Sequence, residues 1–248
     1  MDQDNALVFD DCERDGVDRW FEVLATHVSG ILDQVGVPYC RGDVMAQNPA
    51  WRGSLSEWRS RIHNWVQRLR PQDLLSIDIF FDVRGVAGNI GLAKELRRLA
   101  YEAAKGRADF AKLLIDGGGE LPRTRTWWGG LRTDAGRLDL KKAGLFRIVS
   151  TTRALAICHG IDASSTPSRL QRLKELKIGA ETDLDNLLDA HGVFLDLILK
   201  QQLVDIQRGS PPDNTVDVGG ISHRERARLH NALKSVETLS VMIRDLLF

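Results

Sequence analysis

The chain of 248 residues has few cysteines, no long apolar run and no excess of either charge. Its three cysteines, Cys12, Cys40 and Cys158, are odd in number and scattered, which argues against a disulfide framework and for a reducing, cytoplasmic setting. No cysteine or histidine cluster has the spacing of a zinc site. No apolar run approaches the roughly 20 residues of a membrane span. Lys and Arg balance Asp and Glu at 34 each, so we expect neither nucleic acid nor a membrane as partner.

A hydrophobic content of 43% is enough for a sizeable core, and the length suits one large domain or two ordinary ones. Two aspartates stand one residue apart in Asp2-Gln3-Asp4-Asn5, directly before the apolar run of residues 6–9. This run predicts a short buried strand. Because side chains alternate along a strand, we expect Asp2 and Asp4 on the same side, about 7 Å apart. Such a pair suits Mg²⁺, and a solvated terminus is the alternative.

A second acidic pair lies in the apolar segment of residues 74–84, which predicts a strand. Its two faces would carry Ile77, Ile79, Phe81 and Val83 on one side and Asp78, Phe80, Asp82 and Arg84 on the other. Carboxylates in an apolar strand need compensation for the water that they lose. Either a metal ion or Arg84 would supply it, so an Asp82–Arg84 structural pair is the alternative to a metal site.

The remaining segments predict mainly helices. Helical periodicity covers residues 17–35, the capping box Ser54-Leu55-Ser56-Glu57 opens a helix to about Leu69, and a strand and loop are expected between them at 39–49. Later helices are expected at 90–115, interrupted near Gly106, and at 145–159, 166–176, 182–207 and 222–247. The last of them opens with a second capping box, Ser222-His223-Arg224-Glu225. The helix at 182–207 is expected to turn Leu195 and Leu199 inward, and residues 120–138, with Trp127-Trp128, are expected as a loop. We expect an α/β domain over residues 1–105 and an antiparallel helical bundle over 106–248.

Several strings together resemble one known family. They are DQDNALV at residues 2–8, GVPYCRGDVMAQNPAWR at 36–52, DIFFDVR at 78–84, LDLKKAGLFRIV at 138–149 and PDNTVD at 212–217. In this order they resemble the nucleotidyltransferase family that usually follows CBS domains in bacteria. The first part is distantly similar to the transferase domain of the uridylyltransferase that modifies the regulatory protein PII.

The resemblance implies a polymerase-β-like mixed sheet followed by a helical domain that binds the acceptor. Asp2, Asp4 and Asp82 would be catalytic and would hold Mg²⁺ or Mn²⁺, with Asp78 as the alternative third acid. The substrate-binding residues would be Arg84, Asn48, Arg52 and Lys141. The donor would be a nucleoside triphosphate. The acceptor would be a hydroxyl on a small molecule or on a protein, for example a regulatory protein, and CBS domains are expected upstream in fuller-length relatives.

One feature of the family is missing from the sequence, namely the Gly-rich segment before Asp-x-Asp that contacts the triphosphate. We therefore expect the natural domain to extend upstream of Met1, and we expect impaired transfer if it does not. This leaves three functions open: a nucleotidyltransferase, a regulatory module that binds nucleotide without turnover, and a helical interaction domain with a relic transferase half.

Overall fold

The computed structural model describes residues 2–12, 14–117 and 131–247. Their contacts divide the chain into two compact units, residues 1–103 and 104–248, close to the division after residue 105 that the sequence suggests. The expected loop at 120–138 lies mostly outside the described residues, and Trp127-Trp128 lies entirely outside them. Within the described residues, no helix combines the length and apolar character needed to cross a membrane.

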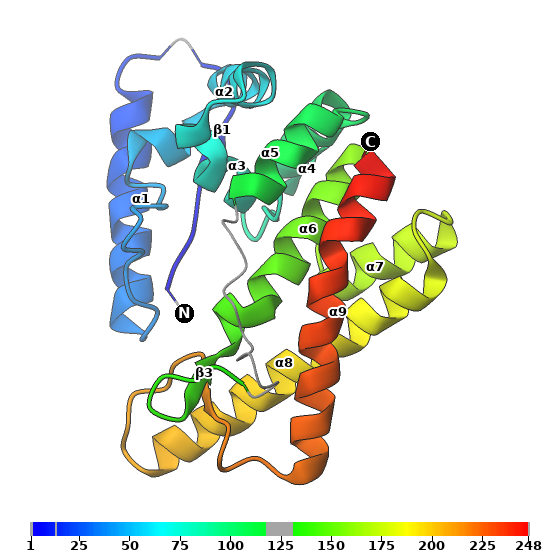
Figure 1. The fold of residues 1–248 in the computed structure, drawn as a ribbon. Helices are drawn as coiled ribbons and strands as arrows, with labels where there is room; N and C mark the ends of the chain where they lie inside the picture. Colours follow the sequence, from blue (N-terminus) through cyan, green and yellow to red (C-terminus); the bar gives the residue numbers. More distant parts are fainter. Residues whose placement is uncertain (1, 13, 118–130, 248) are drawn as a thin grey trace. The chain divides into compact units, whose positions relative to one another are not determined.

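The first unit is built on a two-stranded parallel sheet. Strand β1 (Leu7–Phe9) pairs with β2 (Arg52–Ser54), with Val8 opposite Gly53. Parallel strands need a crossover connection, and this one contains the helix α1 (Val17–Gln34) and the short 3₁₀ helix η1 (Pro49–Trp51). Helices α1 and α2 (Leu55–Arg68) both contact the strand pair (Figure 1). The strand predicted before residue 10 and the helix predicted at 17–35 are confirmed.

The predicted capping box at the start of α2 is also confirmed. The Ser54 hydroxyl accepts a hydrogen bond from the backbone N–H of Glu57, and the Glu57 carboxylate accepts one from the N–H of Ser54 at 2.8 Å. The strand expected within residues 39–49 is reduced to one parallel bridge between Gln3 and Tyr39, followed by turns.

The strand predicted for residues 74–84 is wrong. The structure has a 3₁₀ turn, η2 (Pro71–Asp73), leading into the helix α3 (Leu74–Phe80). Among these residues Ile77, Phe80 and Phe81 are buried, and their spacing of three and four residues is that of a helix. Short apolar runs fit either period, so the surrounding core decides between them.

The rings of Phe80 and Phe81 pack in an aromatic core. The Phe80 ring stacks on Trp58 of α2 with ring centroids 5.5 Å apart and meets Trp65 at 5.4 Å. Phe81 meets Tyr101 of the helix α4 (Ile90–Ala104) edge to face at 5.3 Å. The helix and its C-cap residue thus direct Phe80 and Phe81 toward different aromatic partners, and both rings are buried.

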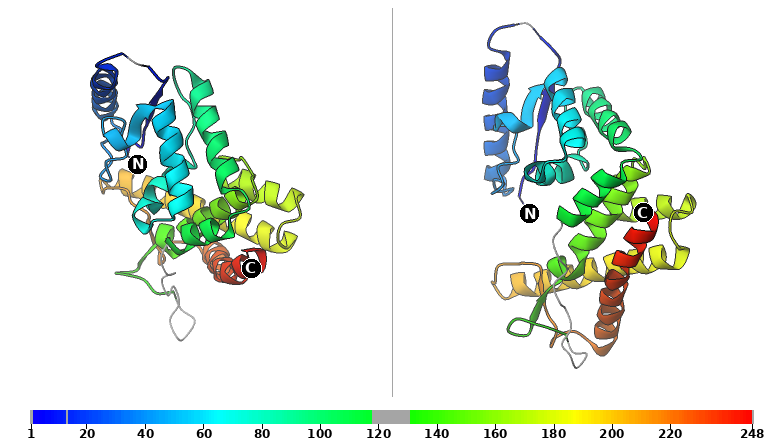
Figure 2. Two further views of the ribbon diagram at one scale, coloured as in Figure 1. Left: turned by 90° about the horizontal axis from the view of Figure 1, so that it is seen from above. Right: turned by 45° about the horizontal axis from the view of Figure 1, so that its top comes forward.

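The second unit is mainly helical. Its helices are α5 (Ala108–Gly117), α6 (Phe146–Cys158), α7 (Thr166–Glu175), α8 (Glu181–Gln207) and α9 (His223–Leu247). The long helix α9 packs across α8 (Figures 1 and 2). The predicted break near Gly106 is confirmed, because its positive φ of 75° separates α4 from α5. The second capping box, Ser222 with Glu225, is confirmed as well.

Two short strands in this unit have no counterpart in the sequence analysis. Strand β3 (Arg137–Asp139) pairs antiparallel with β4 (Thr215–Asp217), and a π-helical turn, η3 (Lys141–Leu145), connects β3 to α6. Within η3 a Cβ on Gly144 would lie 2.6 Å from the Phe194 ring of α8. The glycine therefore allows α8 to approach this turn closely.

Candidate active site

The segment Asp2-Gln3-Asp4-Asn5 alternates strictly between anchored and exposed side chains. Gln3 is only 4% exposed, and its side-chain amide donates to the carbonyls of Ser29 at 3.0 Å and Val37 at 3.2 Å. Asp2 and Asp4, on either side of it, are exposed. In extended backbone this alternation directs the two carboxylates to the same side, away from the core.

Asn5 ties the same segment to the loop of residues 40–48. Its side-chain oxygen accepts a hydrogen bond from the N–H of Ala46 at 2.8 Å, and its own backbone N–H donates to the carbonyl of Val44 at 3.0 Å. The Asn5 side chain also donates to Gln3 at 3.0 Å. The acidic segment and the loop are thus held together by polar groups of residues 3 and 5.

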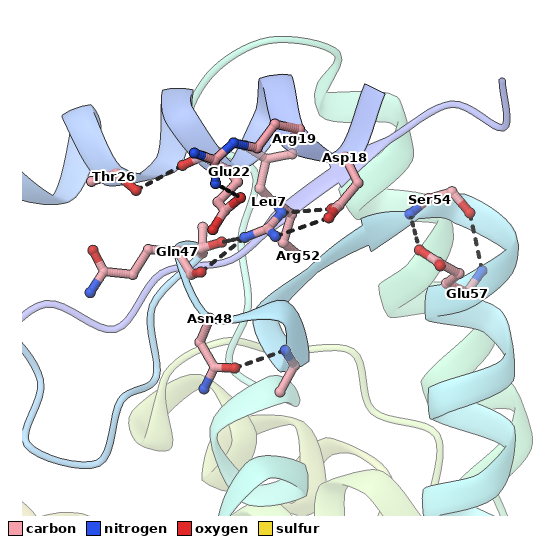
Figure 3. A network of polar contacts seen from close by, with 12 residues as sticks. Leu7, Asp18, Arg19, Glu22, Thr26, Gln47, Asn48, Arg52, Ser54 and Glu57 are labelled. Carbon is pink, nitrogen blue, oxygen red and sulfur yellow. Dashed lines mark hydrogen bonds and ion pairs between the residues drawn. The ribbon is translucent and has the colours of Figure 1, made fainter. Parts of the chain in front are cut away.

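Arg52 holds the other side of this loop (Figure 3). Its buried guanidinium donates to the carbonyls of Ala46 and Gln47, both at 2.9 Å, and binds both carboxylate oxygens of Asp18 in α1 at 2.8 and 3.1 Å. The hydrogen bonds from Arg52 lower the pKa of Asp18. The structure therefore gives Arg52 a set of protein partners, and a contact with substrate stays a prediction.

Asn48 shapes the end of the loop. Its side-chain oxygen caps η1 by accepting from the N–H of Ala50 at 3.0 Å, and its amide donates to the carboxylate of Asp43 at 3.0 Å. Asp43 itself has a positive φ of 55°, which is uncommon outside glycine. Substrate binding by Asn48 likewise stays a prediction.

Asp4 lies beside this loop at Cys40. Burial raises the pKa of the Cys40 thiol, and a hydrogen bond to the Asp4 carboxylate raises it further. Asp4 thus faces the loop that Asn5 and Arg52 fix in place. The exposed Asp4 carboxylate therefore lies against a loop that hydrogen bonds hold in place, and the Asp2 carboxylate is exposed two residues before it.

The predicted third acid is not on a neighbouring strand. Asp78 lies in α3, and Asp82 follows its end, with its N–H bonded to the carbonyl of Ile79 at 3.1 Å. Across residues 2–12, 14–117 and 131–247, no three His, Cys, Asp or Glu side chains are grouped to hold a metal ion. Asp2 and Asp4 fit the pair of carboxylates that Mg²⁺ takes beside phosphate oxygens, whereas the described residues do not assemble a site of three acids.

The other two predicted substrate residues are exposed cations. Arg84 lies beyond α3, so the strand face that was to align it with Asp82 does not exist. Lys141 is the first residue of the π-helical turn in the second unit. Sequence reasoning missed Gln3 and Asn5. The alternation of side chains along the segment could have found them, because it turns Gln3 and Asn5 to the side opposite Asp2 and Asp4. A polar side chain that faces the core needs hydrogen-bond partners.

Two family models match the chain. The model described as "Putative nucleotidyltransferase DUF294" matches residues 1–72, and the one described as "Putative nucleotidyltransferase substrate binding domain" matches residues 109–245. The first range contains the acidic segment, its loop and Arg52, and the second contains Lys141. Asp78, Asp82 and Arg84 lie in neither range. No curated protein and no solved structure matches the chain.

The order of the two matches, a nucleotidyltransferase model followed by a substrate-binding model, indicates the class of nucleotidyltransferase-related proteins. Because the second match covers more than half of the chain, the chain belongs to the family described as "Putative nucleotidyltransferase substrate binding domain". The two matches together support a general nucleotidyltransferase function.

Proposed function

We propose that the chain binds a nucleoside triphosphate at the outward side of Asp2 and Asp4 and transfers its nucleoside monophosphate to a hydroxyl of a protein or small molecule. The observation that carries this proposal is the anchoring of Gln3 and Asn5, which leaves both carboxylates exposed on one side of the segment, with Asp4 beside Cys40 of the loop of residues 40–48. The proposal includes a polymerase-β-like core, similarity to PII uridylyltransferases and CBS domains upstream in fuller-length relatives.

The reaction is a substitution at the α-phosphorus. The acceptor oxygen forms a bond to that phosphorus, the bond to the bridging oxygen breaks, pyrophosphate leaves with the bonding electrons, and the hydroxyl proton passes to solvent. Mg²⁺ or Mn²⁺, when bound, neutralises phosphate charge and aligns the donor. Asp2 and Asp4 would hold the cation, and the proposal includes no third acid, because neither Asp82 nor Asp78 is grouped with them among the described residues. The helical unit, with Lys141, would bind the acceptor.

A second candidate function is nucleotide sensing without turnover. It is favoured by one specific observation, the lack of a third acid grouped with Asp2 and Asp4 among the described residues. Two carboxylates are enough to bind a nucleotide with its cation, while two-metal catalysis uses a larger set of ligands. Such a module would relay the nucleotide state to an unknown regulatory partner.

Thermal unfolding with Mg²⁺ and each of ATP, UTP, CTP and GTP tests the nucleotide site. A ligand at a hundredfold excess over its Kd stabilises the folded state by about 2.7 kcal/mol. We expect a Mg²⁺-dependent shift with at least one triphosphate, and its loss in Asp2→Asn/Asp4→Asn. The matched control, Asp10→Asn/Asp15→Asn, removes two other exposed carboxylates of the same unit and should keep the shift.

Label transfer then separates the two functions. With a donor labelled at the α-phosphate, a transferase leaves label on an acceptor in a cell extract, and a sensing module does not. A shift with UTP alone would agree with a PII-type activity. If none of the four triphosphates stabilises the protein, both functions are refuted and the chain acts as a helical interaction domain.

A further inference from the structure

In the part of the chain that the structure describes, one face of α8 carries a row of large exposed aliphatic side chains. Leu195, Leu199, Leu203 and Ile206 are between 46% and 59% exposed. Their spacing of four, four and three residues puts them on one side of the helix, opposite the residues that pack inside the unit. Sequence periodicity predicted Leu195 and Leu199 to point inward, and the structure contradicts this. We call these four residues, together with the half-buried Leu188 and the exposed Gly192, the α8 row.

Gly192 is the second observation on this face. It lies in the middle of a 27-residue helix, where glycine is less favourable than alanine. A Cβ built on Gly192 would meet no atom within 4 Å, so nothing in the described chain requires a glycine there. A neighbouring backbone that approaches the helix closely from outside would require it, because the distance between packed helices depends on the side chains at their contact.

The charges beside the row are self-complementary. Lys200 lies 3.0 Å from Asp196, four residues before it on the same helix, and 3.0 Å from Glu225 of α9. An antiparallel copy of α8, related by a two-fold axis near Leu197, would bring Lys200 of each copy within one helical turn of Asp196 of the other. The same axis places Leu188 opposite Ile206 and Leu195 opposite Leu199.

We propose that the α8 row is the interface of a homodimer in which two copies of α8 pack antiparallel about a two-fold axis. A two-fold interface uses the same patch on both copies, so the patch must complement itself. The α8 row meets this condition, since apolar residues face apolar residues and Lys200 faces Asp196. Gly192 lets the two helices approach closely at the ends of the contact.

Sedimentation velocity of the whole chain over a range of concentrations tests the dimer. We expect the mass to approach twice 27.7 kDa as concentration rises. Leu199→Glu and Leu203→Glu each bury a charge in the interface and should raise the dimer Kd roughly tenfold or more. Val241→Glu in α9, where the valine is 51% exposed, is the matched control and should leave the mass unchanged.

Charge exchange tests the antiparallel arrangement. Asp196→Lys and Lys200→Asp should each weaken self-association, because each surrounds the axis with like charges. An equimolar mixture of the two variants should form heterodimers. Circular dichroism shows whether every variant remains folded, as we expect for substitutions at surface positions.

A wild-type chain that stays monomeric at all concentrations would overturn the proposal, as would a folded Leu199→Glu variant that dimerises like the wild type. If the wild-type chain dimerises but the mixture of Asp196→Lys and Lys200→Asp forms no heterodimers, the antiparallel arrangement is overturned. The experiment is done without nucleotide, so its outcome is independent of the transferase proposal.

Discussion

Replacing Arg52 by methionine should destabilise the first unit mainly through the backbone carbonyls that lose their donor. The Arg52 side chain is 1% exposed, and it donates to the carbonyls of Ala46 and Gln47. Methionine fills similar space without any donor. A buried polar group left without a partner costs about 1–3 kcal/mol, so two partly buried carbonyls should cost about 2–4 kcal/mol of the free energy of unfolding.

The ion pair with Asp18 contributes less. The Asp18 side chain is 65% exposed, and exposed ion pairs typically contribute about 0–1 kcal/mol. Asp18→Asn should therefore cost at most about 1 kcal/mol. Arg52→Lys keeps the charge but loses the planar fork of donors, so its cost should fall between those of the other two variants.

Urea unfolding followed by tryptophan fluorescence measures these differences, because Trp51 and Trp58 lie in the core of the same unit. If the slope of the free energy of unfolding against urea concentration is the same in the variants and the wild type, the shift in midpoint reports a change in stability. The reasoning is refuted if Asp18→Asn costs as much as Arg52→Met, since the ion pair would then outweigh the carbonyl contacts.

Two further predictions concern ionisable groups. The Ser222 hydroxyl, Lys200 and the Ser222 backbone N–H lower the pKa of Glu225 from its ordinary 4.5 to about 2. The Glu225 carboxylate therefore contributes fully to stability above pH 4.5, and this contribution is lost as the pH falls toward 2. Glu225→Gln should flatten the pH dependence of the unfolding midpoint between these two pH values. An unchanged slope would contradict this prediction. Because Asp4 raises the pKa of Cys40, Asp4→Asn in a Cys12→Ser background should shift the pH profile of Cys40 alkylation to lower pH, and an unshifted profile would show that Asp4 does not lie beside the loop.

The sequence by itself determined the features with local causes. Both capping boxes formed as predicted, because the hydroxyl and carboxylate that satisfy the first turn lie three residues apart in the chain. The break at Gly106 followed from the conformational freedom of one glycine. Apart from α3, helix positions also followed from periodicity, since a helix satisfies its backbone hydrogen bonds within its own segment.

Only the tertiary structure decided which side of each helix is covered and which short segments pair. Helix α1 buries Ala25 and Ser29 while Trp20 and Ile31 stay exposed. Strands β3 and β4 have three residues each, which is too little pattern to predict, and three α-helices and a π-helical turn separate them in the sequence. Residues 74–80 form a helix in which Phe80 packs on Trp58, and Phe81 at its end packs on Tyr101, partners that lie elsewhere in the sequence. Periodicity reports how apolar residues are spaced, whereas burial depends on neighbours that other parts of the chain supply.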